Sequence, residues 1–274
     1  MRNVLLHFHL FKNAGTTIDW CLKRSFGDQF VEHRDDKIMM RGGMHYLMDY
    51  LVGTPNIIGL SSHHMAFDPR WKHRDIHPWY IILLRKPLIR AVSIYEFEKR
   101  QIGDSLGAKR AKDLDMRGYF KWRLGINRRG VIRNFHTHYL SGLSWRKNFI
   151  ITEANYDKAL LNCRNSNVII GFVERFDESM VLFEHVLQPQ FNDIDLSYIT
   201  QNQSPQNIQN PMTYLKSQLG ENIYTKLIKK NAMDLRLYET LEKDFTTHLE
   251  NIPGFENKLL AFQKRSVVIR HSPT

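Results

Sequence analysis

Four short, mostly apolar runs occur in the first two thirds of the chain, and each has the length of a β-strand rather than of a helix. They span residues 3–11, 56–62, 79–85 and 167–173. Helical patterns follow three of them, at 16–26, 87–101 and 176–187. Strands that alternate with helices typically form a parallel sheet covered on both faces. The sequence therefore predicts an α/β fold, a three-layer α/β/α domain with a central parallel sheet.

The length and composition favour a single domain over residues 1–274. The apolar fraction, 42% of 274 residues, is sufficient for one sizeable core. Within this domain we expect a basic helical insertion around 100–135 and a mainly helical C-terminal part at 213–249. The end of the chain, residues 265–274, is expected to be a late strand or a tail.

The sequence lacks the features of a membrane or secreted protein. No window has the 18 or more apolar residues of a membrane span, and the start has no small-residue cleavage site of a signal peptide. The two cysteines, Cys21 and Cys163, lie among apolar neighbours, which fits a reducing compartment. We expect a cytoplasmic protein, and a trimmed lumenal domain stays open as an alternative.

A polar loop follows the first apolar run and has the composition of an anion-binding loop. Its residues are Lys12, Asn13, Ala14, Gly15, Thr16 and Thr17. Backbone N–H groups at the start of the following helix attract an anion, and Gly15 permits a close approach of the backbone. The threonine hydroxyls can donate hydrogen bonds, and Lys12 supplies a positive charge. In a Walker loop the lysine directly follows the last glycine, whereas Lys12 precedes Gly15 by three residues.

A second cationic position comes at the end of the third apolar run. Arg85 ends the run, and Ser93 follows eight residues later, about two turns into the predicted helix. An arginine fork suits a phosphate dianion, and a serine hydroxyl can share that phosphate. Arg90, one turn before Ser93, is expected to pack or pair structurally, although it could reach the same phosphate.

The two stretches together, residues 7–17 and 83–95, resemble the sulfotransferases that use 3′-phosphoadenosine 5′-phosphosulfate (PAPS). The resemblance is to the carbohydrate branch, which includes the heparan sulfate 2-O- and 6-O-sulfotransferases. Residues 168–180 resemble a later strand and helix of the same family, so the likeness covers most of residues 4–190. The resemblance implies that the three-layer α/β/α domain with a central parallel sheet is P-loop-like. It implies that the first loop holds the 5′-phosphosulfate and that Arg85 and Ser93 hold the 3′-phosphate. It also implies that Lys12 reaches the oxygen bridging phosphate and sulfate, and that the product is 3′-phosphoadenosine 5′-phosphate (PAP).

A pair of histidines, His63 and His64, directly follows the second apolar run and is a candidate for the catalytic base. The segment resembles the family's short G-H-x-x-F stretch. That match aligns His64 with the base and Phe67 with the aromatic residue, and it places His63 where the family often has glycine. Which of the two histidines faces the acceptor stays open.

The acceptor is expected to be a hydroxyl of a carbohydrate, with another hydroxyl-bearing acceptor left open, and an acidic acceptor is among the candidates. Cations are dense in the insertion, at Arg100, Lys109, Arg110, Lys112, Arg117, Lys121, Arg123, Arg128, Arg129 and Arg133. Most are expected to form a solvated helical face, and a subset could bind such an acceptor. The interleaved aromatic residues Tyr119, Phe120 and Trp122 could stack on sugar rings or could belong to the core.

Other polar residues receive weaker interpretations. Residues 134–143 resemble a family segment near the cofactor, but His136 and His138 are assigned no role. Asn202 and Ser204, in a polar stretch, are expected to contact the nucleotide.

Three alternatives remain open from the sequence. They are a P-loop nucleotide kinase, a non-catalytic basic nucleic-acid-binding protein, and a catalytically silent relative that only binds the nucleotide. The net charge of +11 allows each of them. The sulfuryl transfer that the resemblance implies requires no metal, and the absence of a Walker B strand and of a tight cysteine–histidine cluster agrees with an expectation of no metal. For a sulfotransferase we also expect no nucleic-acid partner. The sequence does not determine the oligomeric state.

Overall fold

A computed structural model describes residues 1–125, 131–143, 150–192, 194–199 and 211–271. Its centre is a five-stranded sheet in the order β2-β3-β1-β4-β5, and every neighbouring pair is parallel. The strands are β1 (Arg2–Phe8), β2 (Phe30–Glu32), β3 (Gly59–Ser62), β4 (Ile76–Leu84) and β5 (Val168–Phe172). The predicted α/β class with a central parallel sheet is confirmed.

The inner strands are continuous apolar runs because helices cover the sheet on both faces. Leu5 and Leu6 of β1, and Ile81 and Ile82 of β4, are completely buried. Strand β2 has three residues and was not predicted, because so short a segment carries too few positions for a periodic pattern.

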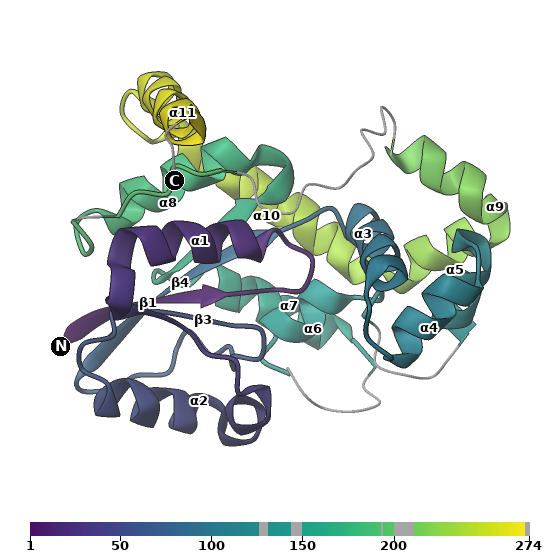
Figure 1. Cartoon of the computed structure of the whole chain (residues 1–274), viewed down its shortest axis with the longest axis horizontal. Coiled ribbons are helices and arrows are strands. Elements are labelled where there is room, and N and C mark those ends of the chain that lie inside the picture. Colours follow the sequence, from purple (N-terminus) through teal and green to yellow (C-terminus); the bar gives the residue numbers. More distant parts are fainter. Residues whose placement is uncertain (126–130, 144–149, 193, 200–210, 272–274) are drawn as a thin grey trace.

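Helices flank the sheet in three layers (Figure 1). In that view α1 (Gly15–Phe26) and α8 (Phe176–Leu187) lie above the strands, and α2 (Asp36–Gly53) and α7 (Glu153–Cys163) lie below them. The placement of α1, α2 and α7 follows from right-handed crossovers, because connections that move in opposite directions along the sheet fall on opposite faces. The remaining helices on the sheet side are α6 (Phe135–Leu140), α10 (Ala232–Glu250) and α11 (Phe255–His271).

A second group of helices gathers beyond the carboxyl ends of the strands, on the right of Figure 1. It consists of α3 (Pro87–Arg100), α4 (Leu106–Asp113), α5 (Met116–Gly125) and α9 (Pro211–Lys230). These helices share a separate hydrophobic cluster that contains Tyr119 and Phe120, and neither of these side chains has exposed surface. Trp122 packs against the same cluster. The three aromatic residues therefore serve the core, and the alternative of sugar stacking is wrong for Tyr119 and Phe120.

The cations of this segment divide into two kinds. Arg100, Lys109, Arg110, Lys112, Arg117 and Lys121 are exposed, as a solvated face requires. Arg123 is half-buried, and it pairs with Glu98 and donates to Tyr119 Oη. Arg128 and Arg129 lie outside the described residues.

The expectation of a late strand or tail at 265–274 is wrong for residues 265–271, which form the end of α11. Tertiary contacts decide this: Phe262 is fully buried, and Arg265 Nη2 donates to both carboxylate oxygens of Glu184 on α8 at 2.8 and 2.6 Å. Residues 272–274 lie outside the described part. No described helix combines the length and the apolar character needed to cross a bilayer.

Candidate functional site at the carboxyl ends of β1 and β4

The sheet order places both predicted anion-binding stretches at one point. Strand β1 connects through α1 to β2 on one side of the sheet, and its neighbour β4 connects to β5 on the other. The carboxyl ends of β1 and β4 therefore border a topological switch point, where α/β sheets bind ligands. The loop after β1 and Arg85 after β4 meet there, and Arg85 Nη1 donates to the backbone oxygen of Lys12 at 3.3 Å.

The loop between β1 and α1 has an unusual backbone. Lys12 and Ala14 adopt left-handed conformations, with φ of 64° and 58°, which non-glycine residues rarely adopt. Asn13 between them is 1% exposed, and its Nδ2 donates to Leu83 O at 2.7 Å and to His136 Nε2 at 3.0 Å. These bonds hold Asn13 inside the molecule, so the neighbouring residues must turn sharply. Rare backbone conformations that are held in this way cluster at ligand sites.

Helix α1 begins at Gly15 with its amino end directed at this loop. No side chain in the described structure caps this end, and the first turn contains no acidic residue. The positive end of the helix dipole and its N–H groups are therefore available to an external anion. Thr16 is exposed, whereas Thr17 is buried and its N–H donates to Ala14 O at 3.1 Å.

Lys12 and Arg85 bring two partly desolvated positive charges together. Burial lowers the pKa of the Lys12 ammonium, and the positive charges of Arg85 and Arg100 lower it further. Burial also lowers the pKa of Arg85, and Glu174 opposes that shift. Lys12 Nζ lies 4.6 Å from the centre of the Phe97 ring. Because like charges in a partly buried site repel one another, a bound anion would stabilise this arrangement.

One face of α3 is turned toward the loop. Arg90 and Phe97, seven residues apart on that face, both contact Phe11: Arg90 Nη1 donates to its backbone oxygen at 3.3 Å, and the two phenyl rings meet edge-on at 5.5 Å. Ser93 lies between them at the i+3 position, on the same side of α3, and is 8% exposed. Arg90 stacks on the Phe135 ring at 3.9 Å, and burial lowers its pKa to about 10. Arg90 therefore packs inside the protein, as expected.

The two adjacent histidines after β3 point in different directions. His63 Nδ1 donates to the backbone oxygen of His9 at 3.0 Å, on the side of the loop. His64 Nε2 lies 3.2 Å from Oδ2 of Asp36, at the start of α2. Phe67 is 2% exposed and stacks on Phe8 at 5.2 Å, so it belongs to the core.

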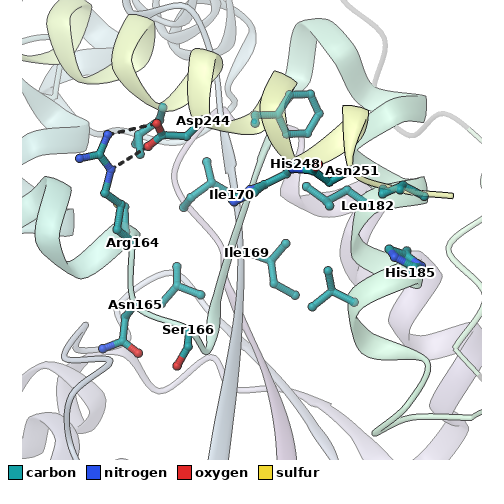
Figure 2. A pocket seen from close by; sticks show the side chains of 16 residues that line it. Arg164, Asn165, Ser166, Ile169, Ile170, Leu182, His185, Asp244, His248 and Asn251 are labelled. Atoms are coloured by element: carbon teal, nitrogen blue, oxygen red, sulfur yellow. Dashed lines mark hydrogen bonds and ion pairs between the residues drawn. The ribbon is translucent and has the colours of Figure 1, made fainter. Parts of the chain in front are cut away.

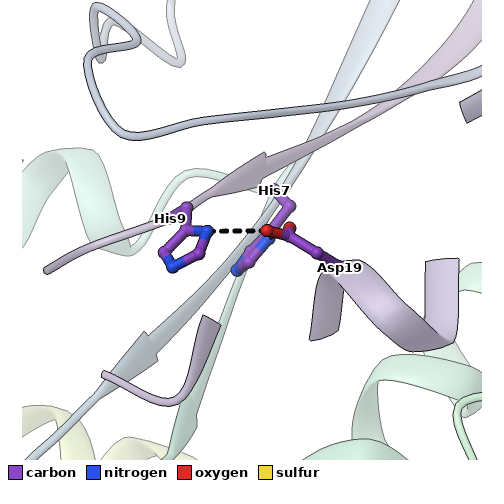
Figure 3. A group of neighbouring side chains, drawn as sticks. All are labelled: His7, His9 and Asp19. Carbon is purple, nitrogen blue, oxygen red and sulfur yellow. Dashed lines mark hydrogen bonds and ion pairs between the residues drawn. The ribbon is translucent and has the colours of Figure 1, made fainter. Parts of the chain in front are cut away.

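A buried carboxylate beneath the loop, Asp19, joins two histidines of the first strand and its extension (Figure 3). His7 Nδ1 lies 2.7 Å from Asp19 Oδ1, and His9 Nδ1 lies 2.8 Å from Oδ2. Burial raises the pKa of the Asp19 carboxyl, but the charges and hydrogen bonds of the two histidines outweigh it and hold the pKa well below its usual range. Sequence reasoning missed this group. Its only local signal was the H-x-H spacing at the end of an apolar run.

These three side chains are also the one group in the described structure whose ligand atoms, all within 4.8 Å of one another, could hold a metal ion. The Nδ1 atoms of His7 and His9 each lie at hydrogen-bond distance from a different oxygen of the Asp19 carboxylate. A carboxylate that accepts two N–H bonds accounts for this geometry without an ion.

Two further acidic residues, which the sequence did not indicate, fix segments around the site through hydrogen bonds. Glu174 accepts from the Lys86 backbone N–H and from Tyr238 Oη, both at 2.9 Å, which fixes the start of α3. Asp234 accepts from the backbone N–H groups of His136 and Thr137 at 2.9 and 2.8 Å.

His136 supports the loop from inside the molecule. It is 1% exposed, and burial holds its pKa well below the usual value, so it is neutral and accepts from Asn13. His138 is half-buried on α6. Asn202 and Ser204 lie outside the described residues.

A separate cavity of about 380 Å³ lies at the opposite end of the sheet (Figure 2). It is bounded by the segment before β5 and by the C-terminal halves of α8 and α10, and the Arg164–Asp244 ion pair lies at its edge. None of the residues predicted for the site lines it.

No family model matches the chain. It is 31% identical, over 246 residues, to an uncharacterized protein of Archaeoglobus fulgidus, and the match covers 87% of this chain and 95% of that protein. The chain belongs to the same family as this archaeal protein. The match extends over most of both chains and is not confined to the loop after β1. The relative's name states no activity, so the function is argued from the site.

Proposed function

We propose that the protein is a PAPS-dependent O-sulfotransferase whose acceptor is a carbohydrate hydroxyl. The observation that carries the proposal is the meeting of the Lys12 loop and Arg85 at the β1/β4 switch point. PAPS has two separate anionic groups, the 5′-phosphosulfate and the 3′-phosphate. The site offers a matching pair of positions: the start of α1 with Lys12, and Arg85 with the Ser93 face of α3.

In the proposed reaction the acceptor oxygen attacks sulfur in line with the leaving group. A bond forms between that oxygen and sulfur, and the bond from sulfur to the bridging phosphate oxygen breaks, which releases PAP. Lys12 offsets the negative charge that develops on the bridging oxygen. The acceptor proton passes to a histidine of the pair His63 and His64.

The acceptor is proposed to be acidic because of the cations near the site. The exposed lysines and arginines of α4 and α5 lie on the helices beyond the carboxyl ends of the strands (Figure 1). The same face would also attract nucleic acid, which is the second candidate. That function predicts binding that weakens steeply with salt and shows no preference for PAP.

The test is a calorimetric titration of the whole chain with PAP, AMP and Mg-ATP. A charge-assisted contact to phosphate contributes roughly 1.5–3 kcal/mol, so PAP should bind at least about ten-fold more tightly than AMP. Arg85→Ala should remove most of this preference, whereas Arg110→Ala, which deletes an exposed charge on α4, should preserve it. Equal affinity for PAP and AMP would refute the proposal, and tighter binding of Mg-ATP would favour the kinase.

A further inference from the structure

This inference rests on the proposed function and concerns the identity of the base. We infer that His63, and not the aligned His64, accepts the proton of the acceptor hydroxyl, and that the backbone carbonyl of His9 fixes the His63 ring in the form a base requires.

The hydrogen bond of His63 determines which of its nitrogens carries the proton. A backbone carbonyl can only accept, so the His63 Nδ1 that lies 3.0 Å from His9 O must be protonated. In the neutral ring Nε2 then keeps its lone pair. The side chain is partly exposed, and within the described chain no hydrogen-bond partner reaches Nε2. His63 thus has a basic nitrogen that no other group in this part of the molecule uses.

Packing places the His63 ring beside the anion-binding loop. The ring centres of His63 and His9 are 3.9 Å apart. The His9 ring in turn packs against Gly15 at the start of α1, because a Cβ built on Gly15 would lie 2.2 Å from His9 Cδ2. His63 is therefore one ring away from the residue at which α1 begins. Asp19 holds that intervening ring in place through His9 Nδ1.

His64 is arranged less favourably for this role. Its Nε2 faces the carboxylate of Asp36 on α2, an acceptor that keeps this nitrogen protonated. Its other ring nitrogen, Nδ1, is buried. His64 would have to leave Asp36 before it could take a proton from an acceptor. It is better placed as a positioning residue that attaches the loop after β3 to α2.

The charges around His63 also suit a base. Burial lowers its pKa most, and the neighbouring His9 and Arg34 lower it further, whereas the carboxylate of Asp19 and the bond to His9 O act in the opposite direction. His64 is a further titratable neighbour, and its ring centre lies 6.4 Å from that of His63. The net effect keeps the ring neutral near pH 7, which is the form that accepts a proton.

The step balances without any further reactant. The acceptor O–H proton moves to His63 Nε2 as the oxygen bonds to sulfur, and PAP departs with the electron pair of the broken sulfur–oxygen bond. The imidazolium then returns its proton to solvent, and no electron is exchanged.

The first test is the tautomer itself. Long-range ¹H–¹⁵N correlation spectra of the histidine-labelled whole chain report which ring nitrogen is protonated, and the signals lost in His63→Asn identify residue 63. We expect a neutral ring with its proton on Nδ1. A proton on Nε2 would overturn the inference whatever the protein catalyses.

The second test measures PAP release from PAPS, with O-desulfated heparin as acceptor and with water alone. The variants are matched: His63→Asn keeps a donor near the position of Nδ1 but has no basic nitrogen, and His64→Gln keeps a donor toward Asp36. We expect His63→Asn to slow release by about 10²–10⁴-fold and His64→Gln by less than about ten-fold. PAP affinity should stay within about three-fold in both variants, since neither is placed at the phosphates.

The outcomes separate this inference from the proposed function. If His64→Gln slows PAP release more than His63→Asn does, the assignment of the base is overturned. The assignment is also overturned if the natural chain binds PAP but releases none from PAPS. A natural chain that does not prefer PAP to AMP removes the sulfotransferase function instead, and with it the catalytic role of His63.

Discussion

Replacing Gly15 with alanine tests whether the loop and the buried histidines form one packed unit. A Cβ at this position would lie 2.2 Å from His9 Cδ2 and 2.4 Å from His9 Nε2, well inside the roughly 3.5–4 Å of an ordinary carbon contact. His9 cannot easily move, because Asp19 holds its Nδ1 and the His63 ring lies against its face. Overpacking of this kind costs about 1–3 kcal/mol.

The expected sign is opposite to that of an ordinary helix substitution. Gly15 is the first residue of α1, and alanine in place of glycine within a helix usually stabilises by up to about 1 kcal/mol. We therefore expect Gly15→Ala to lower the free energy of unfolding by about 1–2 kcal/mol net. In the background of His9→Ala, which removes the ring, the same substitution should be neutral or slightly stabilising.

The assay is urea unfolding of the natural chain, the two single variants and the double variant. The coupling free energy between positions 9 and 15 should be at least about 1 kcal/mol, above the few tenths expected of independent sites. Additive effects of the two substitutions would show that the His9 ring does not occupy the space over Gly15. The placement of His63 beside the loop, which depends on His9, would then also be wrong. PAP titration of the same variants would show whether restoring the packing also restores the anion site.

Three further outcomes are expected. Lys12→Ala should slow PAP release from PAPS by about 10²–10³-fold yet leave PAP affinity within a few-fold, because PAP lacks the bridging oxygen; unchanged turnover would remove Lys12 from the mechanism. The free energy of unfolding should fall as the pH is lowered from about 7 to about 5. The pKa values of His9, His63 and His136 are lowered in the folded protein, so the unfolded chain binds more protons than the folded one in this range. Urea titrations at several pH values measure this, and a free energy of unfolding that does not change with pH would contradict it. Asn13→Ala should destabilise by about 1–3 kcal/mol, since it leaves His136 Nε2 and Leu83 O without the Asn13 amide inside the protein, and a calorimetric melt within experimental error of the natural chain would argue against that role.

Local patterns in the sequence were sufficient for most elements of the sheet and its helices. The helix predicted at 176–187 has those bounds in the structure, and Gly27 ends α1 with a positive φ of 55°. These features depend on the periodicity of neighbouring residues and on the backbone freedom of one glycine, both of which a single stretch of sequence displays. The loop at 12–17 could likewise be recognised by its composition.

The contacts that shape the candidate site depend on the order of the strands, which no local pattern contains. Arg85 reaches Lys12 because β4 lies next to β1, although 73 residues separate them in the chain. His63 meets His9 because β3 lies on the other side of β1. Motif alignment favoured His64 because it compares residue types along the chain. The tautomer of an imidazole depends instead on the partner that the fold places beside each nitrogen, and for His63 that partner is the backbone carbonyl of His9, in the segment that follows β1.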